Sequence, residues 1–237
     1  MPELTIIIPF FNEERTLGKL VQELESLPPK TFNCCIFVDD GSEDNSLAQL
    51  ESALHIVKFE YLVLKKANGG KASAIQFASQ SVKTSHALIL DADLELDTND
   101  VIKMWKIVMD GKSDVVFGYR LFLAQSSFTY RFTYGNKLIS HIFGILYNEV
   151  ITDIMCGFKL IPSDYLRSIP FRFSKFAVEV EIPLMLWLQR VRPYEIEVAY
   201  NPRSRAEGKV IGVKDALQVI FDMVWFRIRM KNKRKKD

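Results

Sequence analysis

The sequence predicts an α/β fold, a doubly wound and mostly parallel sheet with helices on both faces. Short apolar runs alternate with longer amphipathic segments through the first half of the chain, which is the pattern of strand–helix units. Turn signals such as Pro28-Pro29 and Gly69-Gly70 separate the segments. At 237 residues the chain is long enough for one domain with a full core.

Five strands are expected in this first half. They are Leu4–Ile8, Cys34–Val38, Phe59–Leu64, Ala87–Leu90 and Val115–Gly118. Such runs, apolar at nearly every position, are typical of strands buried on both faces of a parallel sheet.

The segments between these strands have helical spacing. Leu17, Leu20 and Leu24 fall on one helical face, and Asn12 is expected to cap that helix. Further helices are expected around Leu47–Leu54, from Gly69-Gly70 to Val82, and over Val101–Met109.

After Arg120 the alternation becomes looser. The sequence predicts a long aromatic helix over Phe128–Tyr147, a strand over Met155–Ile161, a helix over Phe176–Gln189 interrupted near Pro183, and a strand over Ile196–Tyr200. A final amphipathic helix is expected to carry polar residues on one face (Asp215, Gln218, Asp222, Arg229) and apolar residues on the other (Leu217, Ile220, Phe221, Val224, Ile228).

The composition excludes several classes of protein. Residues 227–237 carry seven basic side chains, and the rest of the chain has 24 basic against 28 acidic residues. This mildly acidic body argues against nucleic-acid binding, which needs basic charge on the folded part. Three cysteines make no disulfide framework, so a reducing compartment is expected. No signal peptide or membrane-spanning run is found, and we expect a cytoplasmic protein.

The tripeptide Asp91-Ala92-Asp93 stands where the apolar run Ala87–Leu90 ends, with Glu95 two residues further. Carboxylates at the end of a buried strand point oxygen ligands into the crevice where α/β sheets bind their ligands. Hard cations such as Mg²⁺ or Mn²⁺ prefer these ligands and hold substrate phosphates in their remaining positions. We therefore expect a metal site at Asp91, Asp93 and Glu95.

Two other strands are also followed by polar clusters, Pro9–Glu13 and Asp39–Ser42. Neighbouring parallel strands would bring these clusters and Asp91–Asp93 to one edge of the sheet, where they could hold a nucleoside and its diphosphate. Taken singly, Asn12 and Ser42 could be helix caps and Gly41 a turn residue. The chain has neither a P-loop nor a dinucleotide-binding glycine motif.

These motifs resemble those of a known family. They are Pro9–Glu13, Val38–Ser42, Asp91–Glu95, Gly118–Arg120, Thr152–Lys159 and Arg203–Lys209. Together they resemble the family 2 glycosyltransferases of GT-A fold, and most closely the dolichyl- or polyprenyl-phosphate mannose and glucose synthases. The match runs from Leu4 to about Gly212, nearly the whole chain.

The resemblance implies a metal-dependent, inverting transfer of a hexose from GDP-mannose or UDP-glucose to a polyprenyl or dolichyl phosphate. It also implies a single GT-A domain over residues 1–211. Within it, residues 1–120 would form the nucleotide-sugar half and residues 121–211 the acceptor half. Residues 212–237 would form the C-terminal helix and basic tail.

Carried over by motif, the resemblance assigns nucleoside contacts to one group of residues: Pro9, Phe11, Glu13, Val38 and Asp40. The donor site would also include Asp91, Ala92 and Asp93, with Arg120, Arg203 and Lys209 facing the phosphates. Three residues depart from the usual pattern. Phe11 replaces a tyrosine, Glu95 replaces glutamine or serine, and Gly208 replaces a serine.

The catalytic set expected from this scheme is Asp93, Arg120, Asp153, Arg203 and Lys209. A phosphate acceptor is already anionic and needs cations such as Arg203 rather than a strong base. An acceptor hydroxyl would need a base, for which Asp153 is the candidate; otherwise Asp153 orients Arg120 or a helix end. The competing hypotheses are a hydroxyl-acceptor transferase of the same fold, a non-catalytic nucleotide-sugar-binding subunit, and a nucleotidyltransferase.

The end of the chain suggests a membrane surface. Phe221, Trp225 and Phe226 precede a run of lysines and arginines, a pattern typical of an interfacial anchor. The alternative is a packed core helix with a basic tail. The aromatic segment Phe128–Tyr147 could likewise line a prenyl groove or simply be buried. We expect a peripheral protein at the cytosolic face of a membrane, held there by this helix or by a membrane-anchored partner subunit.

Overall fold

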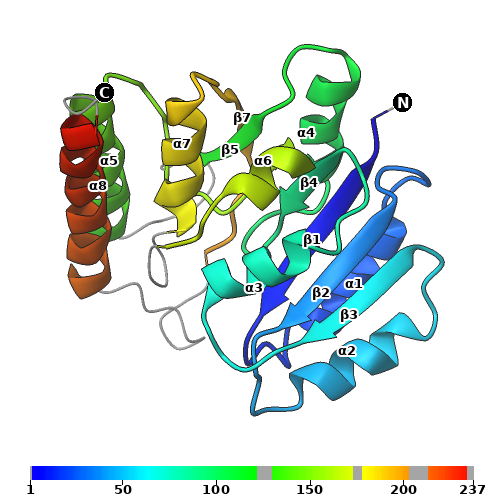
Figure 1. Cartoon of the computed structure of the whole chain (residues 1–237). Helices are drawn as coiled ribbons and strands as arrows, with labels where there is room; N and C mark the ends of the chain where they lie inside the picture. Colours follow the sequence, from blue (N-terminus) through cyan, green and yellow to red (C-terminus); the bar gives the residue numbers. More distant parts are fainter. Residues whose placement is uncertain (1, 122–129, 173–177, 203–212, 234–237) are drawn as a thin grey trace.

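The computed structural model describes residues 2–121, 130–172, 178–202 and 213–233. Arg203 and Lys209 lie outside the described residues. Seven strands form one sheet in the order β3-β2-β1-β4-β6-β5-β7 (Figure 1). They are β1 (Leu4–Phe10), β2 (Cys34–Asp39), β3 (Glu60–Lys65), β4 (His86–Ile89), β5 (Val116–Arg120), β6 (Lys159–Pro162) and β7 (Tyr194–Val198).

The sheet is mostly parallel, as the sequence predicts. Strand β1 pairs in parallel with β2 and β4, β2 with β3, and β5 with β7. Among the described strands, β6 alone runs antiparallel to its neighbours β4 and β5. Every residue of β1 is buried, which explains why its sequence is apolar without alternation.

Helices cover both faces of this sheet (Figure 1). One core cluster joins β1, β2 and β4 to α1 (Leu17–Ser26), α2 (Ser46–Leu54) and α4 (Asp100–Met109). The cluster on the other face includes α3 (Lys71–Ser79), α5 (Tyr130–Tyr147), α6 (Ser163–Ser168), α7 (Val178–Leu188) and α8 (Val213–Lys233). The predicted fold class is therefore confirmed.

Two strand predictions were misplaced. The predicted strand Met155–Ile161 begins only at Lys159; the apolar residues before it are buried in a loop rather than in the sheet. The predicted strand Ile196–Tyr200 ends at Val198. Residues are apolar here because they are buried, whether they lie in a strand or in the adjoining loop. Their hydrophobicity therefore could not indicate where the strands begin or end.

Two helix predictions were also wrong. Asn12 does not cap α1, which begins at Leu17 after Thr16; Asn12 has a φ of 55° and bonds to the loop after β2. Helix α7 runs through Pro183 without interruption. A proline removes only one backbone hydrogen bond, and the residues around Pro183 are buried, so packing holds the helix together.

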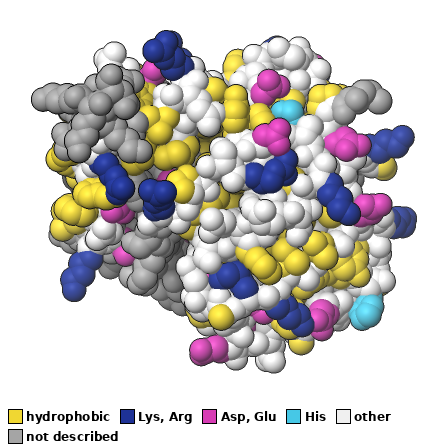
Figure 2. Space-filling model, in the orientation of Figure 1, with side chains coloured by type: hydrophobic (Ala, Val, Ile, Leu, Met, Phe, Trp, Pro, Cys, Tyr) yellow, Lys and Arg dark blue, Asp and Glu magenta, His cyan; other side chains and the backbone are white. Residues whose placement is uncertain are grey.

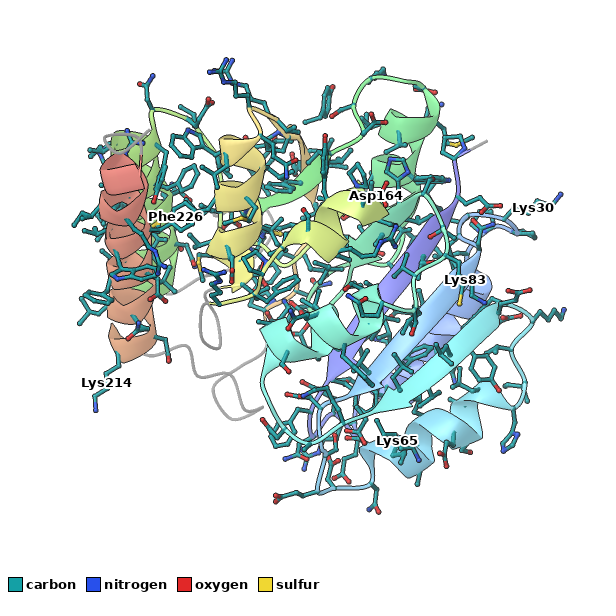
Figure 3. All side chains as sticks on the ribbon, in the orientation of Figure 1. Lys30, Lys65, Lys83, Asp164, Lys214 and Phe226 are labelled. Atoms are coloured by element: carbon teal, nitrogen blue, oxygen red, sulfur yellow. The ribbon has the colours of Figure 1, made fainter. Side chains whose placement is uncertain are left out.

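Helix α8 has the predicted apolar stripe, but Leu217, Phe221 and Ile228 of that stripe are exposed to solvent, whereas Ile220 packs against the core. Val219, Met223 and Phe226 are buried apolar residues of α8 and pack in the core. The Tyr147 hydroxyl of α5 donates a hydrogen bond to the Met223 carbonyl at 2.5 Å. Figure 3 labels Phe226 on α8, with Lys214 extending from the start of the helix. Among the described helices, none combines the length and apolar character needed to cross a bilayer.

Candidate active site

Three of the predicted motifs meet at one edge of the sheet. Strands β1, β2 and β4 are parallel neighbours, so their carboxyl ends lie side by side. The Asp40 amide donates to the Phe10 carbonyl at 2.9 Å, and the Leu90 amide donates to the Ile7 carbonyl at 3.0 Å. The sequence-based expectation that these clusters share an edge is thus confirmed.

The loops after β1 and β2 are bonded to each other. The Asn12 amide donates to the Ser42 hydroxyl at 3.0 Å, and the Glu43 amide donates to the Asn12 side-chain oxygen at 2.8 Å. The Glu13 amide donates to the Ser46 hydroxyl at 2.7 Å. Asn12 and Ser42 therefore act as links between loops rather than as helix caps.

Asp40 organises a third loop, the segment between β3 and α3. Its carboxylate accepts hydrogen bonds from Lys66 Nζ at 2.6 Å, from the Gly69 amide at 3.0 Å and from the Gly70 amide at 2.6 Å. The neighbouring Gly41 has a φ of 80°, and a Cβ there would lie 2.8 Å from the Asn68 amide nitrogen. Only glycine fits both the conformation and the space.

The residues predicted to contact the nucleoside differ in accessibility. Pro9, Val38 and Asp40 are buried, whereas the Phe11 side chain is 41% exposed at the rim. Glu13 is half-buried and accepts a hydrogen bond from the Thr16 hydroxyl at 2.9 Å. Phe11 is thus the member of this group with open ring surface for a base.

Asp91 belongs to a chain of charged side chains that crosses the site. Lys71 Nζ lies 2.5 Å from Asp91 Oδ1 and 2.6 Å from Glu179 Oε1. Lys159 Nζ lies 2.7 Å from Glu179 Oε2 and also bonds to the carbonyls of Ile154 and Cys156. This charge chain (Asp91, Lys71, Glu179, Lys159) joins β4 and α3 to α7 and β6.

The protonation states in the charge chain are fixed by its own contacts. Burial acts to lower the pKa of Lys71, but the carboxylates of Asp91 and Glu179 raise that pKa above its usual value. Burial acts to raise the pKa of Glu179, yet Lys159 and Lys71 lower it. Lys71 and Glu179 therefore keep their charged forms at neutral pH.

Gly157 makes room for this arrangement. A Cβ at this position would collide with the Asp91 carboxylate and would lie 3.0 Å from Lys71 Nζ. The absence of a side chain at Gly157 therefore allows the ion pair between Asp91 and Lys71 to lie against the backbone.

The other two predicted metal ligands differ from each other. Asp93 Oδ1 accepts a hydrogen bond from the Glu95 amide at 3.1 Å. The Glu95 side chain is buried, and its carboxylate accepts a hydrogen bond from the Tyr200 hydroxyl at 2.7 Å. Within the described ranges no three acidic, cysteine or histidine side chains are grouped as metal ligands. The structure thus gives Glu95 a structural partner rather than a place beside Asp91.

Two carboxylates still fit a divalent cation. Mg²⁺ is commonly bound through one or two carboxylates together with substrate phosphates. Asp91 and Asp93 follow β4 at the edge shared by the other motifs, and the Asp91 side chain is 29% exposed. The donor chemistry of this pair therefore suits a cation that is completed by a diphosphate.

Arg120 and Asp153 form a buried ion pair. Arg120 Nε donates to Asp153 Oδ2 at 2.6 Å, and Nη2 donates to Oδ1 at 2.9 Å. The guanidinium also lies over the Tyr200 ring, 4.9 Å from its centroid. Burial acts to lower the pKa of Arg120, but Asp153 raises that pKa above its usual value, so the guanidinium stays charged. Of the two roles considered for Asp153, this geometry matches the one that orients Arg120.

Several residues of the site were not singled out by sequence reasoning. Lys71 directly follows the Gly69-Gly70 turn, and Lys159 ends a motif that was noted only for its resemblance. Glu179 was not among the predicted site residues. Tyr200 gave no signal, because its partner Glu95 is distant in the sequence and an aromatic at a strand end is ordinary.

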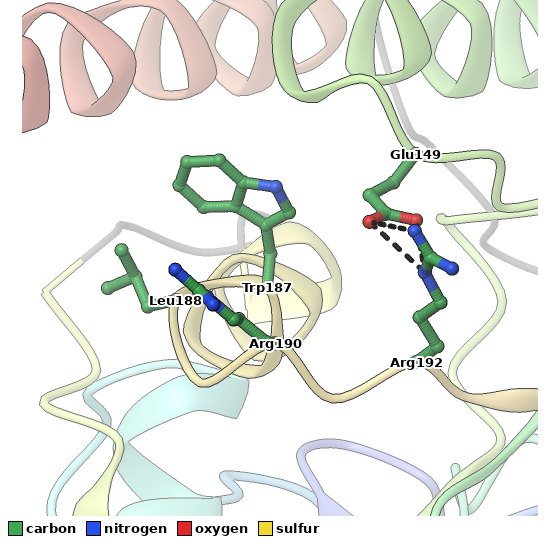
Figure 4. A pocket seen from close by; sticks show the side chains of 5 residues that line it. All are labelled: Glu149, Trp187, Leu188, Arg190 and Arg192. Atoms are coloured by element: carbon green, nitrogen blue, oxygen red, sulfur yellow. Dashed lines mark hydrogen bonds and ion pairs between the residues drawn. The ribbon is translucent and has the colours of Figure 1, made fainter.

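A separate pocket of about 400 Å³ lies away from this site, where α7 ends (Figure 4). It is lined by Glu149, Trp187, Leu188, Arg190 and Arg192, and Arg192 pairs with Glu149 at 2.9 Å. The adjoining Tyr194 amide bonds to the Val115 carbonyl where β5 begins, so the pocket lies toward the opposite edge of the sheet.

Helices α5 and α8 pack together and carry exposed apolar side chains. Leu217, Phe221, Trp225 and Ile228 of α8 are 40–62% exposed. Tyr134, Leu138 and Ile145 of α5 are also exposed. Figure 2 shows hydrophobic side chains on this side of the molecule. We call these seven residues the α5–α8 apolar face.

Comparison with known proteins identifies the class. The sequence profile of the glycosyl transferase family 2 matches residues 5–170, so the chain belongs to this family and is a glycosyltransferase. An uncharacterized protein of Methanocaldococcus jannaschii is 30% identical over 228 residues, which cover 93% of this chain and 97% of the relative.

Two relatives have named activities. Dodecaprenyl-phosphate galacturonate synthase of Rhizobium johnstonii is 26% identical, over 97% of this chain and 68% of its own length. Dolichyl-phosphate beta-glucosyltransferase of Mus musculus is 26% identical, over 96% of this chain and 75% of its own length. These matches confirm the resemblance to lipid-phosphate sugar transferases.

A solved structure shares the fold. Glucosyl-3-phosphoglycerate synthase of Mycobacterium tuberculosis, crystallised with Mn²⁺, uridine diphosphate and phosphoglyceric acid, superposes with a TM-score of 0.73. The alignment covers 95% of this chain and 78% of that chain, at 15% identity. It confirms the GT-A architecture of the sheet and its helices.

Proposed function

We propose that this protein transfers a hexose from a nucleotide sugar to a polyprenyl or dolichyl phosphate, in a single displacement that inverts the anomeric carbon. The observation that carries the acceptor assignment is the engagement of Asp153 by Arg120 through two hydrogen bonds. A carboxylate held in this way is poorly placed to take a proton from a hydroxyl. The named relatives of similar sequence act on lipid phosphates, which supports the same acceptor class.

On the donor side, the edge formed by β1, β2 and β4 would hold the nucleotide. Phe11 offers an exposed ring on which a base can stack, and Pro9, Glu13, Val38 and Asp40 would lie around the nucleoside. The donor is GDP-mannose or UDP-glucose. In this proposal residues 1–120 form the donor half and residues 121–211 the acceptor half.

Asp91 and Asp93 would hold Mg²⁺ or Mn²⁺ together with the donor diphosphate; Ala92 lies between them. When bound, the cation supplies charge stabilisation for the departing nucleoside diphosphate. A structural neighbour crystallised with Mn²⁺ and uridine diphosphate supports this choice of cofactor. Glu95 is omitted from the ligand set because its carboxylate bonds to Tyr200.

The acceptor is an anion, so the site needs positive charge more than a base. Arg120 is buried and held by Asp153, which fixes its charge near the end of β5. Arg203 and Lys209 are proposed to face the phosphates from the segment after β7. Attraction to these cations would bring an anionic acceptor to an anionic donor.

The acceptor is a membrane lipid, and the chain has a surface suited to reach it. The α5–α8 apolar face is exposed, and seven basic residues lie between Arg227 and the end of the chain. Each basic residue near an anionic membrane contributes roughly 1 kcal/mol. We propose peripheral binding at the cytosolic face through this helix and tail, with or without a membrane-anchored partner subunit.

A transfer assay tests the proposal. Labelled GDP-mannose, UDP-glucose and UDP-N-acetylglucosamine would be offered in turn with a short polyprenyl phosphate and Mn²⁺ or Mg²⁺. Label is expected in the organic phase with one donor, and it should be lost with chelator and in the variant Asp93→Ala. Metal-dependent donor binding without transfer to any acceptor would contradict the proposal and favour a non-catalytic subunit.

A further inference from the structure

The charge chain places a lysine where the proposed cation would be expected to bind. Lys71 Nζ lies 2.5 Å from Asp91 Oδ1, close enough for a strong ion pair. A positive charge at this distance competes directly with any cation for the same carboxylate. The competition acts on Asp91, because Asp91 is the carboxylate after β4 with which Lys71 forms its ion pair.

Lys71 also has a second carboxylate, on the side away from Asp91. Glu179 Oε1 lies 2.6 Å from Lys71 Nζ, and Glu179 Oε2 is held by Lys159 at 2.7 Å. The Glu179 and Lys159 side chains are 8% and 1% exposed, whereas Lys71 and Asp91 are 22% and 29% exposed. In the charge chain, the pair of Glu179 and Lys159 is therefore buried and fixed. The pair of Lys71 and Asp91 is more accessible and lies at the proposed metal site.

We propose that Lys71 is an exchangeable counter-ion of Asp91. It neutralises Asp91 when no cation is bound, and it yields that carboxylate to a divalent cation while its ion pair with Glu179 is kept. This inference rests on the proposed metal site and adds a positioning role for Lys71 and Glu179.

The physical basis is the difference between the two partners of Lys71. A lysine ammonium is a compact charge on a flexible stem, so it can shift without moving the backbone. Glu179 retains it, because a buried charge without a partner is costly. Gly157 provides the space in which the exchange occurs, since a side chain there would collide with Asp91 and approach Lys71.

The inference predicts opposite effects for the two partners. Lys71→Met removes the competing charge, so Mn²⁺ should bind about five-fold more tightly to the protein without nucleotide. Glu179→Gln leaves Asp91 as the sole carboxylate of Lys71, so Mn²⁺ should bind several-fold more weakly. Simple damage to the site would weaken binding in both variants.

Glu181→Gln is a matched control. Glu181 lies two residues further on the same helix, is buried, and accepts a hydrogen bond from the Arg172 amide at 2.8 Å. It is the same residue type on the same helix, whereas the ion pair of Lys71 with this helix is made to Glu179. Its substitution should leave the Mn²⁺ affinity within about two-fold, because only a contact with Lys71 transmits the effect.

The Mn²⁺ affinity of the wild type and the three variants is measured by titration, with free Mn²⁺ detected by electron paramagnetic resonance. Thermal melting confirms that each protein is folded. Tighter binding in Lys71→Met and weaker binding in Glu179→Gln is the expected result. Unchanged or weaker binding in Lys71→Met would overturn the exchange and leave sugar transfer untouched. No Mn²⁺ binding by the wild type would overturn the inference and the proposed cofactor together. The expected Mn²⁺ pattern without sugar transfer would support the exchange and contradict the proposed function.

Discussion

Arg120 donates two hydrogen bonds to the Asp153 carboxylate, from Nε to Oδ2 at 2.6 Å and from Nη2 to Oδ1 at 2.9 Å. Both side chains are buried. The two residues come from the end of β5 and from the loop before β6. The pair therefore ties the loop before β6 to the end of β5. It also leaves a guanidinium, rather than a free carboxylate, as the fixed charge at this point.

We predict that Asp153→Asn destabilises the protein by about 3–5 kcal/mol, because it leaves the buried Arg120 charge unpaired. The double variant Arg120→Gln/Asp153→Asn should recover part of this loss. Urea denaturation of the wild type and the three variants measures the coupling energy of the pair. Additive effects of the two substitutions would contradict the paired arrangement.

A second prediction separates Asp93 from Glu95. Asp93→Ala should abolish detectable Mn²⁺ binding, because it removes one of the two proposed ligands. Glu95→Gln should retain binding, because its side chain can still accept the hydrogen bond from Tyr200; its cost in stability should be about 1 kcal/mol. Calorimetric titration with Mn²⁺ distinguishes them, and equal loss in both variants would restore Glu95 as a ligand.

Gly157→Ala should disrupt the ion pair of Asp91 and Lys71, because the new methyl group would collide with the Asp91 carboxylate. We expect a large loss of sugar transfer and a loss of roughly 1–3 kcal/mol in stability. Gly18→Ala is the matched control: nothing lies within 4 Å of a Cβ there, and alanine favours the helix. Full activity in Gly157→Ala would show that the close approach is unimportant.

The α5–α8 apolar face should be required for membrane binding. Substituting Phe221 and Trp225 by serine should reduce sedimentation with anionic vesicles at least about ten-fold, since two large exposed side chains would no longer insert. Ile56→Ser is the control, because Ile56 is more exposed than either residue but lies just after α2. Undiminished sedimentation of the double variant would assign membrane binding to another part of the chain.

His86 makes the stability depend on pH. Burial lowers its pKa below the usual value, an effect only partly opposed by Asp114, and within the described residues Nε2 has no hydrogen-bond partner. The unfolded chain binds a proton below about pH 6.5 while folded His86 stays neutral. The unfolding free energy should therefore fall as the pH drops through this range, and His86→Gln should flatten the slope. A slope unchanged by the substitution would exclude His86 as its source.

The central part of the sheet could be predicted because β1, β2 and β4 are buried on both faces and each has an apolar run of its own, as in Leu4–Ile8. It was harder to predict which face of each helix is buried. Periodicity placed Leu217, Phe221 and Ile228 on one stripe of α8, but could not say that the stripe faces solvent. That depends on α5, whose packing against α8 is a long-range contact.

In the site as well, some residues could be predicted from the local sequence, and others depend on contacts between distant parts of the sequence. Asp91 and Asp93 were predictable, because carboxylates at the end of a buried strand meet the ligand edge of the sheet. Glu179 was not assigned to Lys71, because the two residues are 108 positions apart and no local pattern joins them. Glu95 was expected at the metal from its spacing, whereas the Tyr200 hydroxyl that engages it comes from beyond β7.

The most direct test of the account compares a short polyprenyl phosphate with the corresponding polyprenol as acceptors, using the donor identified by the transfer assay. We predict that labelled sugar is transferred to the phosphate and not to the alcohol, because the site supplies cations and holds Asp153 in an ion pair. Equal transfer to the polyprenol would contradict this account and make the protein a hydroxyl-acceptor transferase.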